Sequence, residues 1–117
     1  MLRMFFLGGL LFSATPLAAQ DMQRLTSLTE FVEVVEGRQL TRFGIKLTVA
    51  PSGDIRGRAF GKDVTGQWRW DAGYFCRDLF FGDEDLGPNC QLVTARGDRI
   101  RFTSDRGAGD SAMFKLR

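Results

Sequence analysis

Apolar residues recur at helical spacing in one short segment of the chain. This apolar stripe consists of Leu28, Phe31, Val32 and Val35. The four positions lie at i, i+3, i+4 and i+7, on one face of an α-helix. Ser27, three residues before Glu30, is typical of a capping box that begins a helix, and Gly37 is a suitable place for it to end. The pattern predicts a short amphipathic helix over residues 28–36, whose apolar face must pack against another element.

Beyond Gly37 the apolar positions alternate with polar ones, which is typical of β-strands. Turns rich in glycine and aspartate divide this part of the chain, and a longer loop is expected over residues 82–88. The expected strands cover residues 45–49, 55–59, 64–71, 74–81, 90–95, 99–104 and 111–116. Since no second helix is indicated, we predict a mainly β fold, a small antiparallel meander that closes into a barrel or folds into a sandwich. The helix is expected to cover one open end.

Residues 1–19 have the layout of a secretory signal peptide. Arg3 supplies one positive charge, an apolar run follows over residues 4–12, and Pro16 precedes small residues at the end of the segment. A membrane anchor would need about 20 apolar residues, and Pro16 cuts this run short. We therefore expect cleavage after Ala19 and a periplasmic or secreted protein without a membrane span.

The remaining residues, 20–117, have the size and composition of a single globular domain. In the whole chain, apolar residues make up 44% and charged residues 26%, and the formal net charge is +2. This near balance of charge does not favour nucleic acid or an acidic membrane as a partner. Histidine is absent, which excludes histidine general bases, histidine-containing triads and histidine metal ligands.

Cys76 and Cys90 are the two cysteines of the chain. An even number of cysteines in a small exported domain favours a disulfide. One alternative is a redox pair, which normally has the spacing Cys-x-x-Cys. Another is a zinc site, which two cysteines cannot complete without histidine. We expect a structural disulfide that joins the strands over residues 74–81 and 90–95.

An aromatic belt is expected over two adjacent strands. Its members are Trp68, Trp70, Tyr74, Phe75, Phe80 and Phe81. These side chains could line a pocket for an apolar or sugar-like ligand, or they could simply fill the core of a small β-domain. The strand over residues 74–81 is apolar on both faces. Either the helix covers its second face, or an exposed patch marks a partner site.

The polar loop over residues 104–110 carries Gly107 and Gly109 beside Arg106. Its backbone N–H groups, together with Arg106, could bind a carboxylate or another anion. The alternative is an ordinary hairpin loop whose glycines take positive φ. Residues 107–112 also match the string G-x-G-x-x-A, but the residues that follow alternate like a strand, whereas the dinucleotide fingerprint opens a helix. A hairpin turn is therefore favoured there.

The acidic segment over residues 83–85, with Asp78 and Asn89, could furnish oxygen ligands for calcium. The EF-hand pattern is not matched, because Leu86 follows Asp85 where that pattern needs glycine. We favour a solvated acidic loop and expect neither a metal nor a cofactor. No pair of carboxylates stands out by its spacing for glycosidase-type chemistry, so no catalytic residue is assigned.

Four motifs occur in order along the domain: G-x-W-x-W at residues 66–70, Y-F-C-R at 74–77, N-C-Q at 89–91 and F-x-S-D-x-G-x-G at 102–109. In this order the chain resembles a group of short exported bacterial proteins without an established activity. Some members carry the automatic name dihydrodipicolinate reductase, which implies a nicotinamide-binding Rossmann domain. Since no βαβ unit is indicated here, we interpret that name as mistaken. The resemblance supports the fold and the disulfide, and it carries over no catalytic residue.

These observations favour a non-enzymatic periplasmic domain that binds a small ligand or another envelope protein. The candidate contact residues are Trp68, Trp70, Tyr74, Arg106 and Asp110. One alternative is an inhibitor of a secreted hydrolase, because a rigid β-domain can place a loop in an enzyme cleft at little entropic cost. Another is an enzyme, either carboxylate-based or matching the reductase name. A filled barrel would favour surface recognition, whereas a hollow one of about 300 Å³ or more would favour a carried ligand.

Overall fold

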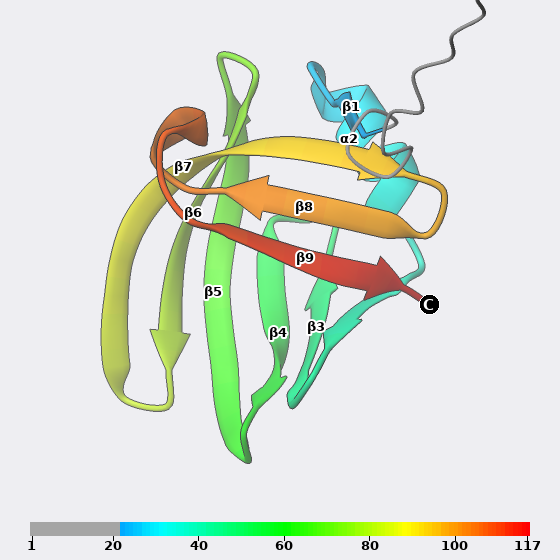
Figure 1. Cartoon of the computed structure of the whole chain (residues 1–117). Helices are drawn as coiled ribbons and strands as arrows, with labels where there is room; N and C mark the ends of the chain where they lie inside the picture. Colours follow the sequence, from blue (N-terminus) through cyan, green and yellow to red (C-terminus); the bar gives the residue numbers. More distant parts are fainter. Residues whose placement is uncertain (1–21) are drawn as a thin grey trace, which may run out of the picture.

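The computed structural model describes residues 22–117. The expected signal peptide, residues 1–19, lies outside the described residues. Within residues 22–117 the fold is a closed antiparallel barrel of eight strands with one short α-helix at one end (Figure 1). The prediction of a mainly β meander is confirmed, and the barrel is the correct one of the two predicted forms.

The barrel strands follow one another in chain order, and each pairs with the next. They are β2 (Gln39–Arg42), β3 (Ile45–Val49), β4 (Asp54–Ala59), β5 (Lys62–Asp71), β6 (Tyr74–Phe81), β7 (Glu84–Arg96), β8 (Arg99–Thr103) and β9 (Ser111–Leu116). The barrel is closed by the pairing of β9 with β2. A two-residue strand, β1 (Gln23–Arg24), pairs with β7, and a 3-10 turn, η1 (Asp105–Gly107), connects β8 to β9.

The helix α2 (Leu28–Val35) begins with the predicted capping box. The Glu30 N–H donates to the Ser27 hydroxyl, and the Glu30 carboxylate accepts hydrogen bonds from the N–H groups of Thr26 and Ser27. Because these bonds favour the ionised carboxylate, they hold the pKa of Glu30 below its ordinary value, with the bond from Thr26 as the largest cause. The start of the helix is therefore fixed by local hydrogen bonds before any packing is considered.

Phe31 anchors α2 in one end of the barrel. Its side chain is fully buried, and its ring centroid lies 5.0–5.2 Å from those of Trp68, Trp70 and Phe75. The expectation that the helix covers an open end is therefore confirmed. The predicted burial of Leu28, the first residue of the apolar stripe, is wrong, because its side chain is 50% exposed. It lies in the first turn of the helix, beyond the aromatic cluster around Phe31.

The prediction of a long loop over residues 82–88 is wrong, because residues 84–88 belong to β7. Gly82 and Asp83 form a tight turn between β6 and β7, and the ladder runs from Phe81–Glu84 to Phe75–Gln91 with one irregularity. Acidic side chains have low strand propensity, but here they are exposed, and pairing with β6 outweighs that preference. The disulfide therefore joins two paired strands and does not span a loose loop.

The alternating pattern also gives no indication of β2. This segment has only four residues, and Leu40 is its single apolar side chain. In the structure Leu40 is 1% exposed and lies opposite Leu47 on β3 and Leu116 on β9. The strand is thus defined by two neighbours, one of which is distant in sequence, and this is information that a local pattern does not contain.

Glycines on β4 and β5 allow the close approach of neighbouring strands. A Cβ atom added at Gly66 would lie 2.1 Å from the carbonyl oxygen of Asp78, and one at Gly57 would lie 2.0 Å from that of Lys46. Real Cβ atoms do not approach backbone atoms so closely, so glycine is required at both positions unless the strands move apart. The glycine of the G-x-W-x-W motif is explained by this contact between β5 and β6.

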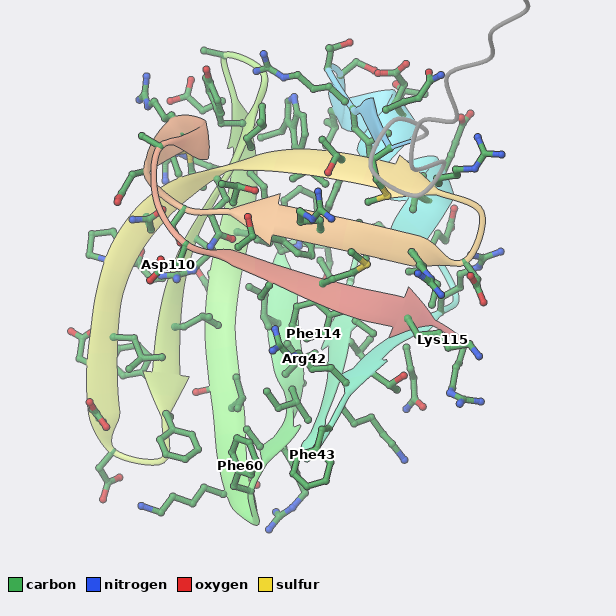
Figure 2. The ribbon with its side chains drawn as sticks, viewed as in Figure 1. Arg42, Phe43, Phe60, Asp110, Phe114 and Lys115 are labelled. Carbon is green, nitrogen blue, oxygen red and sulfur yellow. A yellow bond between two sulfur atoms is a disulfide. The ribbon has the colours of Figure 1, made fainter. Side chains whose placement is uncertain are left out.

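Two phenylalanines are exposed at hairpin tips, away from α2. Phe43 is 91% exposed and Phe60 is 64% exposed. Figure 2 shows them side by side at the tips of the β2–β3 and β4–β5 hairpins. The Phe60 ring lies against Gly44, and the Phe60 N–H donates to the Gly44 carbonyl oxygen at 2.8 Å. Because the Phe43 ring remains in solvent, it contributes little to folding.

Candidate functional site

The disulfide lies between β6 and β7, on the outer face of the barrel. Cys76 and Cys90 stand directly opposite each other in the β-ladder, and their sulfur atoms are bonded. This confirms the predicted pairing. Cys76 is only 2% exposed, so the bond forms a covered floor on this part of the surface. A disulfide in a small domain is typical of proteins in oxidising compartments.

A pocket of about 430 Å³ lies over this disulfide. It is lined by Arg69, Cys76, Arg77, Pro88, Asn89, Cys90, Asp105 and Arg106. Arg69 reaches it from β5, because Arg69 lies opposite Cys76 in the β5–β6 ladder. Arg106 reaches it from η1. Three neighbouring strands and the β8–β9 connection therefore build one site.

The pocket is positively charged. Its lining contains three arginines, Arg69, Arg77 and Arg106, and one acidic residue, Asp105. The Asp105 carboxylate accepts a hydrogen bond from the Asn89 side chain at 2.8 Å, so it is engaged within its own loop. Within residues 22–117, none of the three arginines forms a salt bridge. Since guanidinium groups bind carboxylates and phosphates through paired hydrogen bonds, the pocket suits an anion.

Tyr74 packs against two cationic side chains at the edge of this pocket. The guanidinium carbon of Arg106 lies 5.2 Å from the Tyr74 ring centroid, and that of Arg24 lies 4.8 Å from it. These are cation–π contacts, which hold Arg106 beside β6. Two predicted contact residues, Tyr74 and Arg106, are thus brought together.

The β8–β9 connection uses most of its backbone N–H groups internally. The N–H groups of Gly107 and Gly109 donate to the Ser104 carbonyl oxygen, and that of Ala108 donates to Asp105. The Asp105 N–H donates to the Asn89 side chain at 2.9 Å. These N–H groups are therefore not available to bind an anion, and the alternative of an ordinary hairpin loop fits better. Of its two glycines only Gly107 takes the expected positive φ, and the other positive φ values in this loop are at Asp105 and Arg106. An anion at this site would be held by side chains.

The G-x-G-x-x-A string over residues 107–112 does not open a helix, because β9 begins at Ser111. All strand pairs within residues 22–117 are antiparallel. A dinucleotide site of the Rossmann type needs parallel strands and a crossover helix. The described part of the chain therefore contains no βαβ unit that the reductase name would require.

Trp68 and Trp70, two of the predicted contact residues, lie in the core and not on a contact surface. Trp68 is 8% exposed, and its indole N–H donates to the carbonyl oxygen of Ala50 at 2.8 Å. Trp70 is partly buried, and its indole N–H donates to the carbonyl oxygen of Thr26 at 3.4 Å. Both pack on Phe31. The alternative interpretation, that these aromatics fill the core, describes both residues.

Asp110 lies at the end of the β8–β9 connection, before β9, and is exposed (Figure 2). Its carbonyl oxygen accepts a hydrogen bond from the Ser104 N–H, which closes the loop. Asp110 is not among the residues that line the disulfide pocket. Asp110 therefore helps to close the loop but does not lie beside Arg106 in the pocket.

The acidic turn does not assemble a metal site in the described part of the chain. Within residues 22–117, no group of three or more acidic or cysteine side chains is arranged to hold a metal ion. The Asp85 carboxylate instead accepts a hydrogen bond from the Gly87 N–H at 2.8 Å. In the same residues, no helix is long and apolar enough to cross a membrane.

Sequence reasoning missed Arg69 and Asn89. A signal for Arg69 was present: the Ala72–Gly73 turn sets the β5–β6 register, and this register places Arg69 opposite Cys76. In the sequence Asn89 stands out only as a possible calcium ligand and as part of the N-C-Q motif. Its side chain in fact connects β7 to η1 through two hydrogen bonds, and no local pattern indicates a contact of this kind.

We expect Asn89→Ala to loosen the β8–β9 connection without unfolding the barrel. The change removes both hydrogen bonds to Asp105, and each such bond contributes about 0.5–1.5 kcal/mol. Hydrogen exchange of the Asp105 amide should become at least about tenfold faster. The exposed Gln67→Ala variant is the control and should leave that amide unchanged. Equal exchange rates in wild type and Asn89→Ala would contradict this role for Asn89.

No protein-family model, curated protein or solved structure matches this chain.

Proposed function

We propose that this protein is a non-enzymatic binding domain of the cell envelope that recognises a carboxylate on a small ligand or on another envelope protein. The ligand carboxylate lies between Arg69 and Arg106 in the pocket over the disulfide. The observation that carries the proposal is the charge of this pocket: the exposed side chains of Arg69 and Arg106 line it together with a single acid, Asp105, which is already hydrogen-bonded to Asn89.

The volumes of the interior cavity and the outer pocket support recognition at the surface. The interior cavity of the barrel has a volume of about 170 Å³, whereas the outer pocket has about 430 Å³. Sites for small organic ligands usually occupy about 300–1,000 Å³. The interior is largely filled by Phe31 and its aromatic neighbours, so a ligand of ordinary size does not fit there.

The chemistry of the lining supports binding over catalysis. Both cysteines are in the disulfide, and the other lining residues are arginine, proline, asparagine and aspartate. This set contains no nucleophile paired with a general base. The expected signal peptide and the disulfide together support a place in the periplasm or outside the cell.

The test is a titration with N-acetyl-D-alanyl-D-alanine, a carboxylate of the kind found in peptidoglycan peptides, and with its neutral C-terminal amide. We expect NMR shifts around Cys76, Cys90 and η1 with the acid and not with the amide. The Arg69→Gln, Arg106→Gln double variant should bind the acid at least about tenfold more weakly, because both charge-assisted hydrogen bonds are lost.

The matched control is Arg56→Gln, on the exposed outer face of β4, which should bind like wild type. Equal binding of the acid and the amide, or an unchanged affinity in the double variant, would contradict the proposal.

An inhibitor of a secreted hydrolase is the second candidate, and it is favoured by the rigid presentation of Arg106. This residue is held with φ at +54° in a loop that Asn89 anchors to β7. Addition of the protein should then lower the activity of a lysozyme or a protease, and Arg106→Ala should abolish the effect. Unchanged rates across a panel of such enzymes would exclude this function.

A further inference from the structure

The interior of the barrel contains a cavity whose walls, unlike those of the outer pocket, are mostly apolar. This cavity of about 170 Å³ is lined by Leu40, Leu47, Val49, Ile55, Phe75, Arg77, Leu79, Gln91, Phe102, Ala112 and Phe114. Nine of these eleven side chains are apolar. A wholly apolar cavity of about 150 Å³ accepts a molecule the size of benzene. The interior therefore has room for one ring or a chain of similar volume.

Arg77 introduces a positive charge into these apolar surroundings. It lies between Phe75 and Leu79 on the inward-facing positions of β6, and these two residues line the same cavity. Its Nη1 donates to the Gly87 carbonyl oxygen at 2.8 Å. A guanidinium has five N–H groups, and within residues 22–117 this is the one hydrogen bond that its side chain makes.

The surroundings of Arg77 disfavour its charge. Burial lowers the pKa of its guanidinium, and the adjacent Asp78 carboxylate only partly opposes this effect. Asp78 is exposed and lies at the next position of β6, so its side chain points to the other face of the strand. A half-buried cation without a counter-ion in its cavity is stabilised by any anion that can enter.

Other polar groups near the cavity are already engaged. The Gln91 side-chain amide donates to the Ser104 hydroxyl at 3.2 Å. The Arg42 guanidinium lies 5.6 Å from the centroid of the Phe114 ring, and Figure 2 shows the two residues together in the open part of the barrel. Arg42 is exposed, so its charge is solvated. Arg77 is therefore the cation near the cavity that an anionic ligand would stabilise.

We infer that the barrel interior binds a small amphipathic monocarboxylate, whose single ring or short acyl chain lies among Leu47, Phe102 and Phe114 and whose carboxylate pairs with Arg77. The volume limits the apolar part to about one aromatic ring. This site is distinct from the carboxylate site between Arg69 and Arg106, and it does not depend on that proposal.

The probes are benzoate, which has the size and charge expected, and benzyl alcohol, which has the same ring without the charge. Calorimetry should show that wild type binds benzoate at least about tenfold more tightly than benzyl alcohol. Arg77→Met keeps the length of the side chain and removes the charge. It should lose this preference while still binding benzyl alcohol, because the apolar walls are unchanged.

Two further measurements keep the inference testable if Arg77→Met does not fold. Nuclear Overhauser contacts in wild type should connect the benzoate ring protons to Leu47 and Phe114. The Arg69→Gln, Arg106→Gln double variant should keep the contacts of benzoate with Leu47 and Phe114, which separates this site from the outer pocket. Absence of those contacts, equal affinity for the two probes, or unchanged benzoate binding in a folded Arg77→Met would each overturn the inference.

Discussion

Replacing Phe31 with alanine should lower the free energy of unfolding by about 3–5 kcal/mol, the usual cost of deleting a buried aromatic ring. Phe31 is fully buried, and its ring contacts those of Trp68, Trp70 and Phe75. It is also the side chain through which α2 docks into the barrel. The change therefore removes the burial energy of the ring, opens a cavity and weakens the hold on the helix. Equilibrium unfolding in urea, followed by tryptophan fluorescence, measures the effect.

Phe43→Ala is the matched control for this prediction. It deletes the same ring at a position that is 91% exposed, so the free energy of unfolding should change by no more than about 0.5 kcal/mol. If the two variants lost similar stability, the aromatic cluster around Phe31 would not be the centre of the core.

The Cys76→Ser, Cys90→Ser double variant should lose about 3 kcal/mol of stability. The disulfide joins residues 14 positions apart, and removal of a cross-link of this loop length restores that much conformational freedom to the unfolded chain in the entropic account. The floor of the outer pocket is lost at the same time, so binding of a carboxylate there should weaken as well. Chemical denaturation of the variant measures the first effect, and titration measures the second.

Wild type under reducing conditions provides the control for the disulfide prediction, because it breaks the same bond without changing the side chains to serine. Its midpoint of denaturation should approach that of the double variant. A reduced protein as stable as the oxidised one would show that the paired strands β6 and β7 need no covalent link.

The sequence patterns are sufficient for elements that carry their own signal. Helix α2 has a capping box and an apolar stripe, and β5 has inward tryptophans that alternate with outward polar residues. The elements that are missed have no such signal. Strand β2 depends on β9, and the first half of β7 is held in place by its ladder with β6 although its side chains are acidic.

The alternation of residues along a strand predicts which side chains of the candidate site share a face. It does not predict which of the two faces is buried. Trp68 and Trp70 share a face, and that face is the interior. Tyr74 lies on the outer face and Arg106 on the loop after β8, and the fold brings them together. Arg69 becomes part of the site through the register of β5 with β6, and Asn89 through a contact with η1.

The outer pocket and the interior cavity meet at Arg77, which contributes to the lining of both. The two spaces differ in their surroundings. In the outer pocket, Arg69 and Arg106 are exposed side chains that a large partner can reach, whereas the interior is walled by apolar side chains and limited in volume. Under the two proposals, the same barrel recognises a carboxylate on a macromolecule outside and a small amphipathic acid within.

The most direct measurement of the central claim is NMR observation of the arginine guanidinium Nε–H groups during titration with N-acetyl-D-alanyl-D-alanine. We expect the signals of Arg69 and Arg106 to shift together, with one common dissociation constant, while that of Arg56 stays in place. If the Arg69 and Arg106 signals remained unchanged at a concentration that saturates binding, or if all three moved equally, the pocket over the disulfide would not be the site that recognises the carboxylate.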